Sequence, residues 1–117
     1  MREDPDIVMV GEMRDTDTVE AALNLAETGH LVFSTLHTSG SVQTMSRIVQ
    51  FFNPDQQRQI FTRIADSLLG VLSQRLVPRR DGSNKRVALF ERMLVNSGIK
   101  NLIRTGDLAQ VDNAIQM

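Results

Sequence analysis

The chain has 117 residues, 13 basic and 14 acidic side chains, a formal net charge of −1 and no cysteine. The balanced charge gives no reason to expect nucleic acid as a partner. No apolar run approaches the ~18 residues of a membrane span, and no apolar stretch of the signal-peptide kind follows the charged N-terminus, so we expect a cytoplasmic protein.

The first predicted element is a strand within "DPDIVMVGEMRD", residues 4–15. Its apolar run, residues 7–10, is continuous, which is typical of a strand covered on both faces. A helix is predicted next, with Asp17 as its cap and Glu20 completing a capping box. Gly29 is well placed to end that helix in the left-handed conformation.

The segment "LVFSTLHT", residues 31–38, predicts a second buried strand. The order strand, helix, strand indicates a βαβ unit, whose two strands run parallel. The remaining elements are predicted as follows: helices over 39–52 and from the Asn53 cap and Pro54 to Gly70, a hairpin of strands 71–78 and 85–94, and two short helices separated by Gly106. The sequence therefore predicts an α/β fold.

The carboxyl end of the first strand is the candidate functional site. Ligands of open α/β sheets bind outside the carboxyl ends of the strands, where Glu12 follows the apolar run. A carboxylate in that place can orient Mg²⁺ or an attacking water during phosphoryl transfer. Thr35, His37 and Thr38 end the second strand and are expected to face the same crevice, where a histidine can sense a phosphate by hydrogen bonding.

Each of these residues also has a structural interpretation. Glu12 has the pattern of an ordinary surface carboxylate, and His37 that of a structural hydrogen-bonding residue. His30 follows a helix-ending glycine, where a side chain can cap free carbonyl groups. Arg14 and Asp15 can pair with each other or cap the following helix. The spacing of the two histidines does not match a metal site without a third ligand from elsewhere.

The phosphate-binding loop of ATPases in this fold class has the pattern G-x-x-x-x-G-K-S/T. Residues 1–117 do not contain that pattern. We therefore expect the chain alone to bind nucleotide weakly and to hydrolyse ATP only at background level.

Several segments together resemble one known family. "REDPDIVMVGEMRD" resembles the atypical Walker B segment of the ATPases that drive type IV pili and type II secretion, and "AETGHLVFSTLHT" resembles their His box. "GIKNLIRTG" is similar to the "AIRNLIRE" signature of the pilus-retraction members, the PilT and PilU types. The resemblance covers nearly the whole chain, including "LLGVLSQRLVPRRDG".

The resemblance implies the C-terminal part of a RecA-like P-loop ATPase core, from a longer motor that carries Walker A and a PAS-like domain upstream. It divides the chain into residues 1–94, the core portion, and 95–117, a helical segment with the retraction signature. It implies a homo-hexamer that hydrolyses ATP with Mg²⁺ to power pilus retraction, and thereby twitching motility. The partner implied is the pilus machinery at the inner membrane, with no nucleic acid and no other small substrate.

Carried over by position, Glu12 matches the Walker B glutamate, which acts on Mg²⁺ indirectly and on the attacking water. His30 and His37 match the two His-box histidines, which link nucleotide state to movement between subunits. Arg14 matches the arginine of the same motif, for which the resemblance secures no role.

The retraction signature is matched by five residues: Ile99, Asn101, Leu102, Ile103 and Arg104. Gly98, Lys100 and Thr105 depart from it. On spacing alone this segment is an ordinary amphipathic helix, and both interpretations hold together if the apolar face packs inward while polar residues touch a partner. The alternatives are an assembly or secretion ATPase of the same family, or a stand-alone module that binds the full-length ATPase.

Overall fold

The computed structural model describes residues 6–116. Its strands and helices are, in chain order, β1 (Ile7–Glu12), α1 (Thr16–Glu27), β2 (Leu31–Thr35), α2 (Ser41–Gln50), α3 (Pro54–Ser67), β3 (Gly70–Pro78), β4 (Arg86–Leu94), α4 (Ser97–Arg104) and α5 (Leu108–Gln116). Within this range, no helix has both the length and the apolar character needed to cross a bilayer.

The cap of helix α1 lies two residues earlier than predicted. Asp15 is extended, and its Oδ1 accepts the Thr18 backbone N–H at 2.9 Å and the Thr18 hydroxyl at 2.8 Å. The prediction of Asp17 as the cap is therefore wrong, because Asp15 already satisfies the free amide in the first turn. The predicted end is confirmed, since Gly29 has φ of 96°, a conformation that favours glycine.

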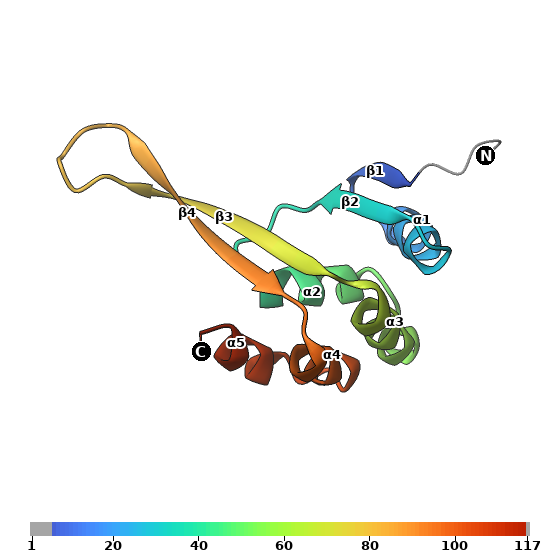
Figure 1. Cartoon of the computed structure of the whole chain (residues 1–117). Helices are drawn as coiled ribbons and strands as arrows, with labels where there is room; N and C mark the ends of the chain where they lie inside the picture. Colours follow the sequence, from blue (N-terminus) through green and yellow to red (C-terminus); the bar gives the residue numbers. More distant parts are fainter. Residues whose placement is uncertain (1–5, 117) are drawn as a thin grey trace.

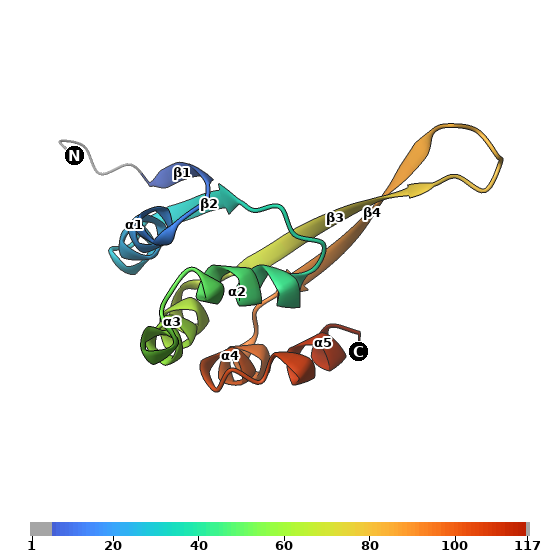
Figure 2. The ribbon, with the colours of Figure 1, turned by 180° about the vertical axis from the view of Figure 1, so that it is seen from behind.

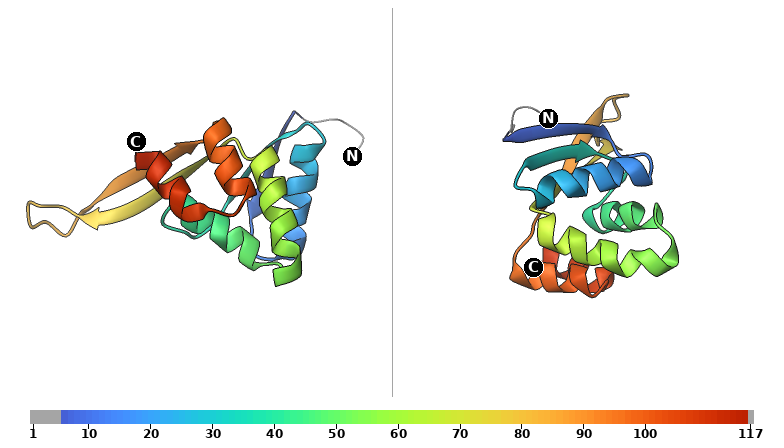
Figure 3. Two further views of the ribbon diagram at one scale, coloured as in Figure 1. Left: turned by 90° about the horizontal axis from the view of Figure 1, so that it is seen from below. Right: turned by 90° about the vertical axis from the view of Figure 1, so that its right-hand side faces the viewer.

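Strands β1 and β2 are parallel, which confirms the predicted βαβ unit. Their register runs from Ile7 opposite Leu31 to Glu12 opposite Thr35. Helix α1 covers one face of the pair (Figure 3). The other face is open, with Met9 65% and Phe33 54% exposed. The prediction of strands covered on both faces is wrong for the described residues, because only one face has a helix packed on it.

Strands β3 and β4 form the predicted hairpin, paired from Gly70 opposite Leu94 to Pro78 opposite Arg86. It extends from the helices as a long arm (Figures 1 and 2). The prediction that Gly70 ends α3 is wrong, since α3 stops at Ser67 and Gly70 opens β3. A Cβ at Gly70 would lie 2.9 Å from the Met93 carbonyl oxygen, so close strand pairing explains this glycine.

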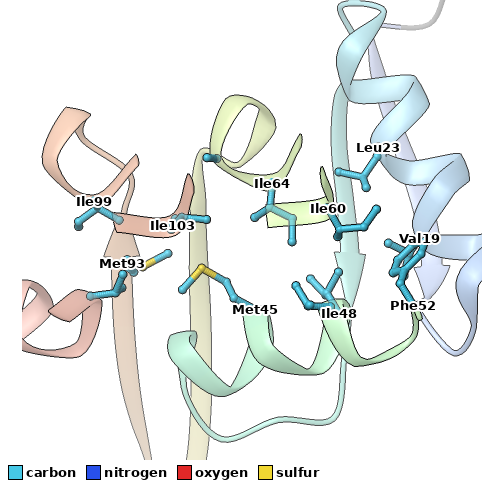
Figure 4. Close-up of a cluster of buried hydrophobic side chains, with 13 residues drawn as sticks. Val19, Leu23, Met45, Ile48, Phe52, Ile60, Ile64, Met93, Ile99 and Ile103 are labelled. Carbon is cyan, nitrogen blue, oxygen red and sulfur yellow. The ribbon is translucent and has the colours of Figure 1, made fainter. Parts of the chain in front are cut away.

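The core lies between helices α1 to α5 and the base of the hairpin (Figure 4). Met45 of α2 and Ile103 of α4 are 0% exposed, and Met93 of β4 is 1% exposed. Val111 of α5 belongs to the same cluster. The residues after 95 thus pack into one core with the elements before them, while the division at residue 95 stays a prediction.

Two ion pairs join helices that are distant in sequence. Arg63 on α3 holds Glu27 at the end of α1 through Nη2–Oε1 at 2.7 Å and Nε–Oε2 at 3.0 Å. Arg104 on α4 lies 2.8 Å from Asp66 on α3. All four side chains are partly exposed, so each pair adds orientation more than stability.

The buried position of Ile103 gives a direct test of this core. Ile103→Ala is expected to lower the free energy of unfolding by about 2–5 kcal/mol, because it removes buried methyl groups and leaves a cavity. Urea unfolding followed by circular dichroism measures the change. The matched control is Asn101→Ala on the exposed face of α4, and equal losses in the two variants would contradict the packing described.

Candidate functional site

Glu12 is the last residue of β1 and lies opposite Thr35 at the carboxyl end of the parallel pair. The ladder is irregular between Met9 and Glu12. Two bonds to β2 hold the strand end: Ser34 Oγ donates to the Gly11 carbonyl at 2.8 Å, and the Met13 N–H donates to the Thr35 carbonyl at 2.9 Å. The Glu12 side chain is therefore presented from a fixed strand end, 26% exposed.

Arg14 and His37 bind the Glu12 carboxylate from two sides. Arg14 places both Nε and Nη2 2.8 Å from Oε2 of Glu12. His37 Nε2 lies 2.8 Å from Oε1. The structure thus brings together Glu12, Arg14 and His37, and each oxygen of the carboxylate already has a partner.

This arrangement favours the ionised form of Glu12. The Arg14 hydrogen bond is the main cause that holds the pKa of the Glu12 carboxyl below its ordinary value, and His37 acts in the same direction. A carboxylate with a lowered pKa is a weak proton acceptor. It is better suited to holding a cation or orienting a water molecule by accepting its hydrogen bond.

Of the described residues, Glu12 is the single carboxylate that this site offers to a Mg²⁺ ion. Among residues 6–116, no group of three or more acidic, histidine or cysteine side chains forms a metal-binding set. Mg²⁺ in nucleotide sites keeps several waters and takes its other oxygens from one or two carboxylates and the phosphates. A single carboxylate such as Glu12 can supply one such oxygen, and its indirect contact with a nucleotide-bound ion stays a prediction.

His30 lies apart from this cluster. It directly precedes β2, at the end of the parallel pair opposite to Glu12. Its Nδ1 is 3.1 Å from the Leu25 carbonyl oxygen and 3.1 Å from the Thr28 hydroxyl, both at the end of α1. The capping alternative thus describes its contacts within the chain, and any role in nucleotide sensing would require a different partner.

Arg47 on α2 is a residue that sequence reasoning missed. Arg47 lines a cavity of about 180 Å³ together with Glu12 and Arg14. It also lines a second cavity of about 290 Å³, and His37 lines both. The Arg47 guanidinium lies 5.5 Å from the centre of the Phe51 ring. Only the fold shows that Arg47 borders the Glu12 site.

The predicted retraction signature forms α4, which lies across α3 from β1 and β2 (Figures 1 and 3). Ile99 and Ile103 are buried and Leu102 is half-buried, whereas Asn101 and Arg104 are exposed. This is the amphipathic packing that the alternative interpretation predicts. It also leaves Asn101 on the surface, so the expectation of a partner contact stays open.

Comparison with known proteins supports the sequence resemblance. The model of the family "Type II/IV secretion system protein" matches residues 1–113. A "Twitching motility protein" of Neisseria gonorrhoeae is 45% identical over 99% of this chain and 31% of its own length. The "Type IV pilus retractation ATPase PilT" of Pseudomonas aeruginosa is 46% identical over 99% of this chain and 33% of its own length.

Comparison with solved structures points the same way. The crystal structure of "the Pilus Retraction Motor PilT and Bound ADP" matches 99% of this chain with a TM-score of 0.86 and 50% sequence identity, and 33% of that motor is covered. The predicted fold class is confirmed by this match. The chain spans about a third of the length of the curated relatives it matches.

The contacts of Glu12 predict how its charge responds to mutation. Arg14→Ala is expected to raise the pKa of the Glu12 carboxyl toward the ordinary glutamate value, because the main group that favours its charged form is lost. In the wild type, the ion pair between Glu12 and Arg14 stabilises the fold at neutral pH. This stabilisation is lost as the pH falls through the lowered pKa of Glu12. Carbon-13 NMR titration of the Glu12 carboxyl in the wild type and in Arg14→Ala measures this pKa.

Arg47→Ala is the matched control for that titration, since Arg47 borders the same cavity. It should leave the pKa of Glu12 close to its wild-type value. An unchanged pKa in Arg14→Ala would contradict the ion pair.

Proposed function

Because the chain belongs to the type II/IV secretion system protein family, we propose that it is the C-terminal part of a motor ATPase that powers type IV pilus retraction. ATP and Mg²⁺ are the proposed nucleotide and ion. Glu12 orients the attacking water and contacts the ion indirectly. The phosphate-binding loop comes from residues outside this chain.

The observation that carries the proposal is the charged Glu12 carboxylate at the carboxyl edge of a parallel pair, held by Arg14 and His37. In phosphoryl transfer, catalysis comes mainly from positioning and from charge stabilisation. Arg14 and His37 keep Glu12 ionised and fix its direction before nucleotide arrives. When a nucleotide-bound ion approaches, Glu12 can exchange these partners for water and the ion, which ties the position of His37 to the state of the site.

The proposed assembly is a homo-hexamer that acts on the pilus machinery at the cytoplasmic face of the inner membrane. Support comes from the similarity to retraction ATPases along the whole chain, including α4. Asn101 lies on the exposed face of α4, where it can contact a partner while Ile99 and Ile103 pack inward. The association with the membrane is then indirect, through those partners.

A hybrid protein tests the proposal. The segment of the Pseudomonas aeruginosa relative that aligns with this chain is replaced by residues 1–117, so that the relative supplies the phosphate-binding loop. The hybrid is expected to hydrolyse ATP, and Glu12→Gln is expected to lower kcat by about 100-fold or more, because the neutral amide no longer orients water or the ion. The isolated chain should stay at background.

The control in the hybrid is Glu20→Gln, which neutralises an exposed carboxylate on α1. Its kcat should match that of the unmodified hybrid. Full turnover in Glu12→Gln would overturn the assignment of Glu12. Expression in cells that lack their own retraction ATPase tests the direction: restored twitching supports retraction, whereas a hybrid that hydrolyses ATP but does not restore twitching counts against it.

A further inference from the structure

Helix α2 begins without a capping side chain of its own. Its N-cap residue is Gly40, which offers no side-chain oxygen. The first amide of the helix, that of Ser41, instead donates to Oε1 of Glu91 on β4 at 2.9 Å. The two residues are 50 positions apart. A carboxylate is a favoured partner for a helix N-terminus, because it meets both the free amides and the positive end of the helix dipole.

The segment that Glu91 holds is the one that follows His37. Within it, the Thr38 and Thr44 hydroxyls lie 2.6 Å apart, and Ser39 donates its backbone N–H to Gln43 at 2.6 Å. Both contacts stay between the loop and α2. Among the described side-chain hydrogen bonds of residues 38–41, the bond to Glu91 is the one that ties this segment to another element.

Glu91 lies on the side of β4 that also bears Met93, which is 1% exposed and part of the core. Its partner across the hairpin is Ser73, which is 6% exposed and whose hydroxyl has no hydrogen-bond partner among the described residues. Glu91 therefore sits on the face of the hairpin that packs against the body, and its bond to Ser41 links the start of α2 to that strand.

We propose that Glu91 is a positioning residue for the candidate catalytic site. By holding the Ser41 amide, it sets the start of α2 and the loop that brings His37 to Glu12. A shift of the hairpin, or of α4 which follows it, then changes the contact between His37 and Glu12. This inference rests on the proposed function for its catalytic meaning, whereas the physical coupling between Glu91 and His37 stands independently.

NMR of this chain tests the coupling without any ATPase activity. Two signals are measured: hydrogen exchange of the Ser41 amide, and the change in the His37 ring resonances that Glu12→Gln produces. Glu91→Ala is expected to speed the Ser41 exchange by about tenfold or more, since its acceptor is gone, and to abolish the His37 response to Glu12→Gln. Glu91→Gln keeps an oxygen acceptor, so it should retain both the slow exchange of the Ser41 amide and the His37 response.

Two further variants separate positioning from simple stability. Ser73→Ala, on the same face of the hairpin, removes an unpartnered hydroxyl and should leave both signals unchanged. Gly40→Ser added to Glu91→Ala supplies a local cap, because Gly40 is extended and a Cβ there meets only Glu91 Oε1 at 4.0 Å. If the local cap restores the stability of α2 but not the His37 response, the contact between elements is what positions His37.

The proposal is overturned if Glu91→Ala leaves the His37 response intact, or if the local cap restores that response in full. Should Glu91→Ala fail to fold, Glu91→Asp takes its place, since it withdraws the carboxylate by one methylene. In the hybrid ATPase, Glu91→Ala should lower kcat by about tenfold with KM for ATP unchanged, and Glu91→Gln should recover it. An inactive parent hybrid would count against the proposed function alone, because the NMR result decides the coupling.

Discussion

Helices α2 and α3 hold the two parts of this molecule together. The parallel pair β1 and β2 and the hairpin of β3 and β4 are separate sheets within the described residues, with no strand pairing between them. Their relative position depends on helices, and α2 contributes Met45, Ile48 and Val49 to the shared core. Because α2 starts close behind His37, the same helix that closes the core also places a residue of the candidate site.

This arrangement makes the site dependent on distant contacts. Glu12 is fixed by the strand end, but His37 reaches it from an exposed loop, with its side chain 88% exposed. Such a loop holds one position only if both of its ends are anchored. β2 anchors the first end, and the bond between Ser41 and Glu91 anchors the second. A motor that converts nucleotide state into movement needs a link of this kind, in which a small displacement at one end alters contacts at the other.

Sequence reasoning predicted the elements well because their signals are local. Apolar periodicity, Pro54 and the glycines at 29 and 106 mark helices and turns through backbone preferences that act over a few residues. It also predicted that Glu12 and His37 would meet, since parallel strands place their carboxyl ends together. The errors at Asp17 and Gly70 concern boundaries. Asp15 satisfies the same capping rule as Asp17, and Gly70 serves close strand pairing and not the end of α3.

The remaining features depend on pairs that are far apart in sequence. Nothing near Glu91 in the chain marks it as the partner of Ser41, and nothing near Arg47 marks it as a neighbour of Glu12. The open faces of the strands were missed for a similar reason. A continuous apolar run predicts burial, but whether both faces are covered depends on elements that the run itself does not encode.

The central claim is that Glu12 faces the reacting end of a nucleotide. The most direct measurement is a crystal structure of the hybrid with Mg²⁺ and a non-hydrolysable ATP analogue. The account predicts that Glu12 leaves at least one of its present partners, Arg14 or His37, and turns to a water beside the terminal phosphate. A nucleotide bound with Glu12 still closed on both partners and remote from that phosphate would contradict it.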